Sequence, residues 1–377
     1  MGPTSSVPFV EKVRPYPRKP EKITMALIEE TTLISSPSSP QCKVQHEAPA
    51  LAFSVGEYTQ NFFHDFVDVL IPLFITVNSI FPDQDFILVI FKSRDWWITK
   101  YADLLKGFSR HPIRTFESDI DTHCFPSATV GLITHGVMTI DPKLIPNSKN
   151  FMHFHALLGN TYGKKQPSSS KPPKARPRLV FAGRSGGVGR VILNQAEVKL
   201  AAEEVGFEVI VFEPTSSTTL PESYALISSS HVMVGVHGAA LTHFLFLRPG
   251  SVFVQIVPIG VENMAEVCFG KAAKELAVEY MEYKIGVEKS SLLEKYGKDD
   301  IVLKGPMALH KKARASGITD VSADKQSAKF DLVKFMEYMK IMDIYLKEQD
   351  IKLDLIKFKL YLERAYQKAK VLVDKEG

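Results

Sequence analysis

The chain has 377 residues, of which 45% are hydrophobic and 23% are charged, and this length can bury one large core or two ordinary ones. We therefore expect two domains. Its 46 basic and 42 acidic residues leave a net charge of +4 and are scattered along the sequence. This distribution excludes the basic stripe typical of nucleic-acid-binding proteins and suits an anionic small molecule.

The first 165 residues divide into an arm and a domain. Residues 1–45 are rich in Pro, Ser and Lys, which predicts an extended N-terminal arm with at most one strand, over residues 23–34, and no evident core. Over residues 46–165, strand-like runs such as ALAFSV and DFILVIF alternate with helix-like runs. This alternation predicts an N-terminal α/β domain. The longest apolar run, residues 67–81, is interrupted by polar residues and proline, and we expect no membrane span.

His64 and Asp68 lie in the helix-like run NFFHDFVDVL and are four residues apart, so they share one helical face. A carboxylate beside an imidazole orients the ring and raises its basicity. We predict a general base with its orienting group, and Asp68 itself is the alternative base. Asp65 projects about 100° away and is the weaker candidate. The structural alternative is a surface ion pair.

The three cysteines are too few for a disulfide framework and lack the spacing of metal ligands. Cys42 and Cys124 both lie in the N-terminal half. We expect them to pair if the protein folds in an oxidising compartment, which leaves Cys268 free. Two Asp-x-Asp matches, residues 83–85 and 119–121, resemble metal sites of some transferases, but such short matches arise by chance. We expect no metal.

The second half begins after a linker. Residues 163–177 read GKKQPSSSKPPKARP, a composition typical of linkers. Strand-like and helix-like runs then alternate over residues 178–330, which predicts a doubly wound parallel sheet. Residues 331–377 are predicted to be helical and to pack back onto the N-terminal domain.

A glycine-rich loop lies in the stretch RLVFAGRSGGVGRVILNQAEV, residues 178–198. Its glycines do not have the G-x-G-x-x-G spacing of dinucleotide-binding loops. Arg184 and Arg190 flank the loop, and paired guanidiniums suit a diphosphate leaving group because they remain charged and fork onto phosphate oxygens. The alternative is a βα turn with two solvated arginines.

A second loop follows a later strand-like apolar run in the same half of the chain. His237, Gly238, Ala239 and Ala240 come directly after it, and small residues at a helix start let phosphate oxygens approach the free amides. His237 and Thr242 are predicted as additional donors, with a buried core histidine as the alternative. Both loops follow strands of one doubly wound sheet, where such sheets bind their ligands.

The stretch VGVHGAALTHFLFLRPGSVFVQIVPIG closely resembles a segment of the family 61 glycosyltransferases, in particular the plant xylan pentosyltransferases. Further stretches agree with this group in the same order: KVRPYPRK, PALAFSVGEYTQNFFHDFVDVLIPLF, HCFPSATVGL, the glycine-rich stretch and QDIKLDLIKFKLYLERA. The resemblance covers almost the whole chain.

The resemblance implies a GT-B fold, in which two Rossmann-like domains face each other across a cleft. It also implies inverting transfer of xylose or arabinofuranose from a UDP-sugar to a xylan-type polysaccharide acceptor, without a metal or other cofactor, in the Golgi lumen. The catalytic residues would then be His64 and Asp68. The donor-binding residues would be Arg184, Arg190, Asn194, His237, Gly238, Ala239 and Thr242.

The chain departs from the family pattern in several places. Ala240 replaces a glycine, and Glu57 and Gln60 stand near positions where plant members usually have glycines, which indicates altered acceptor choice or reduced activity. Family members normally begin with a membrane anchor, a stem and a first part of the N-terminal domain; the sequence starts without an apolar signal segment, so we expect that domain to be truncated. The alternatives are another transfer by the same fold, such as xylose to N-glycans, and an inactive UDP-binding scaffold.

Overall fold

The computed structural model describes residues 9–35, 40–81, 85–115, 121–163, 176–184, 187–315 and 328–376. The chain forms two compact units, Met1–Leu157 and Leu158–Gly377. Most of the expected linker and part of each Asp-x-Asp match lie outside the described residues.

The first unit is built on a parallel four-stranded sheet. Its strands are β4 (Ala50–Ser54), β5 (Ile87–Phe91), β6 (Arg114–Thr115) and β8 (Ala128–Val130), in the order β6-β5-β4-β8. All five residues of β4 are buried, as expected for a central strand of a parallel sheet covered on both faces. The predicted α/β architecture of this half of the chain is confirmed.

A continuous helical run follows β4. It consists of α2 (Phe62–His64), a π-helical turn η1 (Asp65–Leu70) and α3 (Ile71–Ile80). This run is long and apolar enough to cross a membrane by length and composition, but 67% of its most apolar window is buried inside the structure, which is typical of a core helix. Helix α4 (Asp95–Phe108) also belongs to this unit. Helix α5 (Phe151–Tyr162) begins in it, and its Phe154 packs edge-on against Phe66 and Phe74.

The N-terminal segment is more structured than an extended arm. Strand β1 (Phe9–Val13) pairs antiparallel with β2 (Thr31–Ser35), and helix α1 (Lys22–Leu27) lies between them in the chain, so the expected strand over residues 23–34 is only partly correct. The expectation of no core is wrong, because Tyr16 and Ile28 are buried. The Tyr16 ring lies against Gly56, where a Cβ would collide with it and where φ is +76°, so this position requires glycine.

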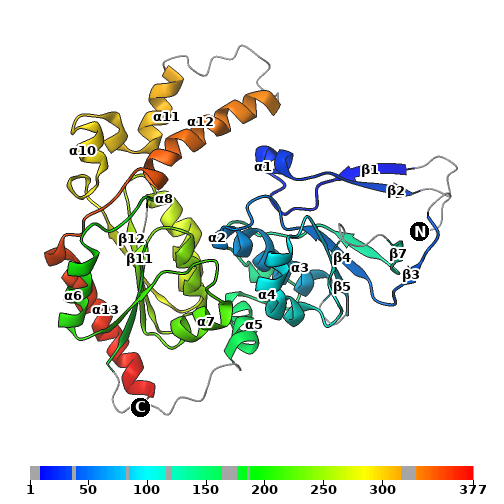
Figure 1. The fold of residues 1–377 in the computed structure, drawn as a ribbon, viewed down its shortest axis with the longest axis horizontal. Helices are drawn as coiled ribbons and strands as arrows, with labels where there is room; N and C mark the ends of the chain where they lie inside the picture. Colours follow the sequence, from blue (N-terminus) through cyan, green and yellow to red (C-terminus); the bar gives the residue numbers. More distant parts are fainter. Residues whose placement is uncertain are drawn as a thin grey trace. The chain divides into compact units, whose positions relative to one another are not determined.

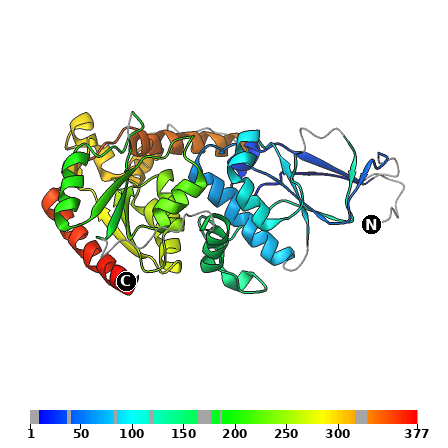
Figure 2. The same ribbon diagram turned by 60° about the horizontal axis from the view of Figure 1, so that its bottom comes forward.

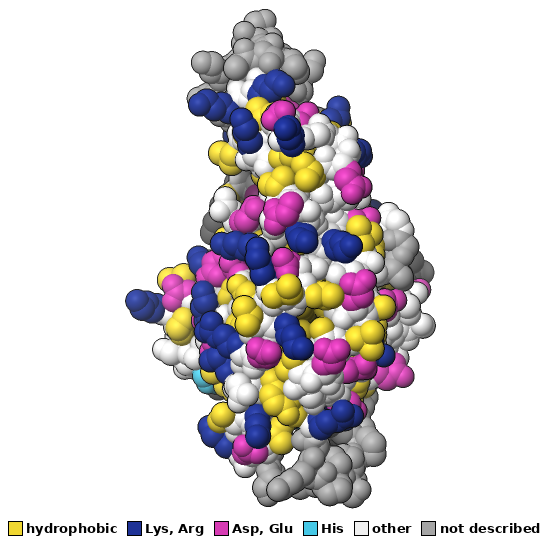
Figure 3. Space-filling model, turned by 90° about the vertical axis from the view of Figure 1, so that its left-hand side faces the viewer, with side chains coloured by type: hydrophobic (Ala, Val, Ile, Leu, Met, Phe, Trp, Pro, Cys, Tyr) yellow, Lys and Arg dark blue, Asp and Glu magenta, His cyan; other side chains and the backbone are white. Residues whose placement is uncertain are grey.

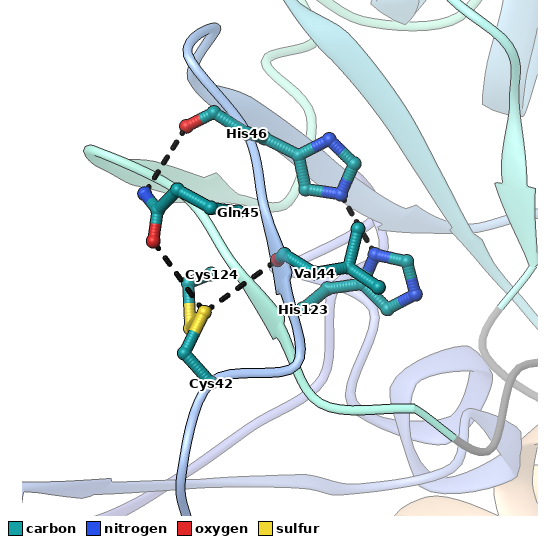
Figure 4. The surroundings of a disulfide bond; sticks show 6 residues. All are labelled: Cys42, Val44, Gln45, His46, His123 and Cys124. Carbon is teal, nitrogen blue, oxygen red and sulfur yellow. Dashed lines mark hydrogen bonds between the residues drawn. A yellow bond between two sulfur atoms is a disulfide. The ribbon is translucent and has the colours of Figure 1, made fainter.

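A disulfide joins Cys42 and Cys124, with a Cα–Cα distance of 5.9 Å. The predicted pairing is confirmed, and Cys268 takes part in no disulfide within the described residues and is buried. Figure 4 shows the bridge beside a short parallel ladder between β3 (Val44–Gln45) and β7 (His123–Cys124). His46 Nε2 lies 2.7 Å from His123 Nδ1 next to it.

Removing this disulfide lowers the stability of the first unit. The bridge closes a loop with a sequence separation of 82, so Cys42→Ser with Cys124→Ser should cost about 4 kcal/mol by the chain-entropy estimate. Urea unfolding of the oxidised protein and of this double variant measures the difference. Cys268→Ser is the matched control, and three free thiols in denatured protein from an oxidising compartment would contradict the pairing.

The second unit contains a parallel five-stranded sheet in the order β10-β9-β11-β12-β13. The strands are β9 (Arg178–Ala182), β10 (Glu208–Phe212), β11 (Val232–Val236), β12 (Val252–Val257) and β13 (Glu279–Lys284). After β9 the chain adds β10 on one side and then β11 on the other. The strand order therefore reverses between β9 and β11, and open α/β sheets bind ligands at such a switch point.

Helices cover both faces of this sheet. On one face α6 (Gln195–Val205) and α13 (Leu355–Glu376) lie side by side, as Figures 1 and 2 show, while α7 (Leu220–Ser228) and α8 (Glu262–Ala265) lie on the other. Along β12, Val252 and Val254 join the core cluster beneath α13, whereas Phe253 stacks on Phe244 on the opposite side. This alternation follows from the twofold period of a strand.

The remaining elements complete the described parts of the chain. They are η2 (Pro142–Leu144), η4 (Ala239–Phe246), η5 (Glu266–Gly270), α9 (Lys271–Glu275), η6 (Val287–Lys289), α10 (Leu292–Tyr296), η7 (Ile301–Lys304), α11 (Pro306–Ala315) and α12 (Ala328–Lys347).

Helix α13 does not pack where the sequence analysis placed it. Its buried residues Phe358 and Leu362 belong to the core of the second unit, together with residues of α6 and the sheet, so the expected packing onto the N-terminal domain is wrong for this helix. Ile356 and Leu360, two apolar side chains of the same helix, are 84% and 64% exposed. The surface bearing α6 and α13 accordingly shows hydrophobic side chains scattered among charged ones (Figure 3).

Candidate functional site

Two loops of the second unit meet at the switch point of its sheet. The glycine-rich loop follows β9, and the segment from His237 to Ala239 follows β11, the strand next to β9. Arg190 Nη1 donates a hydrogen bond of 2.8 Å to the backbone oxygen of His237. The structure therefore brings the two predicted loops into contact, although Arg190 and His237 are 47 residues apart in the sequence.

The backbone of the glycine-rich loop directs Arg190 toward His237. Gly189 has φ +67°, and a Cβ there would collide with the backbone of Lys347, so only glycine fits. Arg190 itself has φ +59°, and its amide donates to the backbone oxygen of Gln349. These constraints fix the backbone position from which the Arg190 side chain extends.

Arg184 and Arg190 form a positive cluster without a carboxylate partner among the described residues. Arg184 lies against Gly238, where a Cβ would be 3.1 Å from its Nη2. Burial lowers the pKa of Arg184, and burial together with the charge of Arg184 lowers the pKa of Arg190 to about 9. The Nε of Arg190 is buried and has no hydrogen-bond partner in the described structure. A bound anion would relieve both the repulsion and the missing hydrogen bond.

His237 is a neutral, buried side chain. Burial and the charges of Arg190 and Arg184 lower its pKa to about 3. Its Nδ1 lies 2.7 Å from Nε2 of Gln255, whose Oε1 accepts a hydrogen bond of 2.7 Å from the Tyr280 hydroxyl. When the amide donates to Nδ1, the ring proton is on Nε2, so Nε2 is a hydrogen-bond donor.

The remaining predicted donor-binding residues differ in their surroundings. Gly238 and Ala239 lie at the start of the 3₁₀ helix η4, which no side chain caps. Thr242, in the same helix, is fully buried, and its Oγ1 has no partner within the described residues. The side-chain amide of Asn194 instead donates to the backbone oxygen of Leu353 at 3.0 Å and accepts from the backbone nitrogen of Leu353 at 2.9 Å. Its role in donor binding stays a prediction.

The first unit brings His64 and Asp68 together as predicted. His64 Nδ1 lies 2.8 Å from Asp68 Oδ2. The carboxylate also accepts a hydrogen bond of 2.7 Å from Tyr16 and another of 2.7 Å from Arg18. Burial raises the pKa of Asp68, but the hydrogen bond from His64 and the charge of Arg18 outweigh burial, so this pKa is below its usual value.

These contacts favour His64 as the base. Asp68 is buried, ionised and bound by three donors, so it orients the ring and is poorly suited to take a proton itself. Because an ionised carboxylate can only accept, His64 donates from Nδ1, and in the neutral form of the ring the lone pair is on Nε2. The His64 side chain is 23% exposed, which leaves the ring accessible to a substrate.

Asp65, the weaker candidate, has a structural role. It accepts hydrogen bonds from Trp97 Nε1 at 2.9 Å and from the Tyr101 hydroxyl at 2.7 Å. Burial raises its pKa despite these two donors. These bonds attach the π-helical turn to α4.

The backbone before this helix contains one unfavourable position. Gln60 has φ +87°, in the left-handed region that favours glycine. It is one of the two positions near which family members usually have glycines. The chain therefore keeps a glycine-like backbone conformation with a larger residue close to His64 in the sequence.

Tyr16 and Arg18 also contact the site, and no sequence pattern indicated either of them as a site residue. Both lie in the stretch KVRPYPRK, whose only distinguishing feature in the sequence is its resemblance to a family motif. An aromatic residue and an arginine between prolines have no helical or strand periodicity, so a search for periodic elements overlooks them.

Comparisons with known proteins show which family the chain resembles. The sequence model of the family described as Glycosyltransferase 61 matches residues 62–254. The chain is 36% identical to the xylan glycosyltransferase MUCI21 of Arabidopsis thaliana, over 87% of this chain and 69% of the relative. It is 35% identical to the alpha-1,3-arabinosyltransferase XAT2 and 35% identical to the beta-1,2-xylosyltransferase XAX1, both of Oryza sativa subsp. japonica. These two matches cover 86% of this chain and 55% and 57% of the relatives, so the chain spans little more than half of their length.

Proposed function

The chain belongs to the glycosyltransferase 61 family, and on this premise we propose that it transfers a pentosyl residue, xylose or arabinofuranose, from a UDP-sugar to a xylan-type polysaccharide. The observation that carries the proposal is the pair Arg184 and Arg190 at the switch point of the sheet, half-buried and without a carboxylate partner in the described structure. The names of the relatives, which refer to xylan, arabinosyl and xylosyl transfer, support the sugar class.

In the proposed mechanism the second unit binds the donor. Arg184, Arg190 and the His237 Nε2–H contact the diphosphate, and the start of η4 adds backbone amides. These groups stabilise the negative charge that develops on UDP as the glycosidic bond breaks. Each unit has a parallel sheet with a switch point, between β4 and β8 in the first unit and between β9 and β11 in the second. These two sheets support, as part of the proposal, a GT-B arrangement of two Rossmann-like domains across a cleft.

The first unit supplies the base. His64 Nε2 removes the proton from the acceptor hydroxyl, whose oxygen attacks the anomeric carbon from the face opposite UDP, so the reaction inverts the configuration. Asp68 accepts the hydrogen bond from Nδ1 and stabilises the imidazolium that forms. The Cys42–Cys124 disulfide supports an oxidising compartment such as the Golgi lumen.

The proposal includes no metal ion. The two guanidiniums supply the positive charge that a divalent cation provides in other transferases. Transfer should therefore continue at full rate in EDTA. Loss of activity in EDTA with recovery on addition of Mn²⁺ would contradict this part of the proposal.

Replacing either arginine should weaken nucleotide binding. Arg184→Ala and Arg190→Ala each remove a charge-assisted contact of about 1.5 to 3 kcal/mol, so UDP affinity should fall about tenfold or more. Calorimetric titration with UDP measures the effect. Arg364→Ala is the control, because Arg364 is an exposed arginine of the same unit, 3.9 Å from Glu279, and should leave the affinity unchanged. Unaltered binding in both arginine variants would show that the cluster does not hold the diphosphate.

The substrate is tested by a screen of UDP-sugars against xylan oligosaccharides with mass detection of products. A mass increase of one pentose supports the proposed function. The second candidate is a UDP-binding scaffold, which Ala240 favours because its Cβ lies where the family has glycine. UDP binding without transfer by the protein or by its Ala240→Gly variant would indicate the scaffold.

A further inference from the structure

We propose that Tyr16 and Arg18 are positioning residues of the transfer reaction, because they fix the carboxylate of Asp68 in the orientation that directs the His64 ring. This inference rests on the proposed role of His64 as the base. Both residues precede the span 62–254 that matches the family model, and they come from the segment that the sequence analysis described as an arm without a core.

Arg18 is held between two carboxylates. Its Nε donates to Asp68 Oδ1 at 2.7 Å, and its Nη1 lies 3.1 Å and 3.0 Å from the two oxygens of Glu21. Thr24, on helix α1, donates to Glu21 Oε2 at 3.0 Å. Helix α1 thus fixes Glu21, Glu21 fixes the guanidinium, and the guanidinium fixes one oxygen of Asp68. A planar guanidinium with two such contacts has little rotational freedom.

Tyr16 fixes the other oxygen. The side chain is fully buried, its ring lies against Gly56, and its hydroxyl donates to Asp68 Oδ2 at 2.7 Å. Burial and the charge of Asp68 raise the pKa of Tyr16, so the hydroxyl remains protonated and can only stabilise the ionised form of Asp68. The backbone nearby is also fixed, because the Ser54 amide donates to the Pro15 oxygen at 2.8 Å.

Together these contacts determine the direction of the His64 hydrogen bond. With one carboxylate oxygen bound by Arg18 and the other bound by Tyr16, Asp68 cannot rotate about its side-chain bonds without breaking a bond to one of them. His64 Nδ1 therefore meets Oδ2 in one geometry, at 2.8 Å. Arg18 Nη2 lies 3.3 Å from the same Nδ1. Because a guanidinium nitrogen cannot accept a hydrogen bond, it is not a partner for the Nδ1–H, and Asp68 is the acceptor for the ring.

The test uses Tyr16→Phe, which keeps the ring, with Arg18→Lys and Arg18→Ala. Each variant should lower kcat by about 10- to 100-fold, since each loses a hydrogen bond to a charged group. The KM for the donor and the affinity for UDP should not change. Guanidinium chloride added at millimolar concentration should partly restore kcat in Arg18→Ala and should have no effect on Tyr16→Phe.

The matched control is Arg14→Ala. Arg14 belongs to the same segment, but its contacts are the Ile28 backbone oxygen at 3.1 Å and Glu30 at 3.3 Å. Its loss should leave kcat unchanged. An equal fall in kcat for Arg14→Ala, or wild-type kcat in both Tyr16→Phe and Arg18→Ala, would overturn the inference.

A spectroscopic readout separates this inference from the proposed function. The ¹⁵N shifts of the imidazole should show the neutral His64 protonated on Nδ1 in the wild-type protein and a mixture of tautomers in Tyr16→Phe and Arg18→Lys. An unchanged Nδ1–H tautomer in these variants overturns the positioning role whether or not the protein transfers a sugar. If the wild-type protein has this tautomer but transfers no pentose, Tyr16 and Arg18 still orient the His64 ring through Asp68. In that case the proposed function fails.

Discussion

His64→Ala and Asp68→Asn should each lower the turnover of pentosyl transfer by about 10²- to 10⁴-fold, the usual contribution of general base catalysis. His64→Ala removes the atom that accepts the proton. Asp68→Asn replaces an acceptor-only carboxylate with an amide, so the Nδ1–H hydrogen bond and the stabilisation of the imidazolium are weakened. Rates measured at saturating donor, with UDP affinity measured in parallel, test this prediction. The affinity should stay constant, because the proposed diphosphate contacts all come from the second unit.

The double variant tests whether the two residues act as one unit. When two residues act as one catalytic unit, replacing either of them already removes the shared function. His64→Ala with Asp68→Asn should therefore be little slower than either single variant. His153→Ala is a control in the same unit, since His153 is exposed and its ring lies 2.8 Å from Asn150. Multiplicative losses would assign the two residues independent roles, and full activity in both single variants would exclude the pair from the mechanism.

A truncation that ends at Asp350 should unfold the second unit. It removes Leu353, Phe358 and Leu362, which are buried in the core cluster of that unit, and a buried side chain of this kind contributes about 1.5 to 3 kcal/mol. Their combined loss is comparable to the entire net stability of a typical domain, about 5 to 15 kcal/mol. Circular dichroism and urea unfolding of the truncated protein test this prediction.

Point substitutions on α13 give a matched comparison. Phe358→Ala should cost about 3 to 5 kcal/mol because Phe358 is fully buried. Ile356→Ala and Leu360→Ala should each stay within about 0.5 kcal/mol, because both side chains are mostly exposed. Soluble, cooperative folding of the truncated protein, or equal costs at buried and exposed positions, would contradict the observed packing of α13.

Much of the second unit could be predicted from local sequence patterns. The apolar runs that became β9, β11 and β12, and the glycines between them and the next helices, indicate strands and turns without reference to the rest of the chain. The spacing of His64 and Asp68 likewise indicates a shared helical face, and a face shared by residues four apart survives the local change from α to π helix. These predictions succeeded because they depend on neighbours a few residues away.

The surface against which α13 packs is decided only by the tertiary structure. An amphipathic pattern shows that a helix buries one face, but the same stripe fits any apolar surface of similar shape. Here Phe358 and Leu362 enter the core of the second unit, while the apolar Ile356 and Leu360 remain exposed. The prediction of a helix was therefore correct, but the predicted packing surface, the N-terminal domain, was wrong.

The sequence by itself determined the alternating elements, the loops at the strand ends and the pairing of His64 with Asp68, because backbone geometry sets these features within about one helical turn or one strand. The tertiary structure alone decided which distant groups complete the sites. Tyr16 and Arg18 reach Asp68 across sequence separations of 52 and 50, and Arg190 reaches His237 across 47. Such contacts depend on strand order and on the path of a segment without periodicity, and no local pattern encodes either of them.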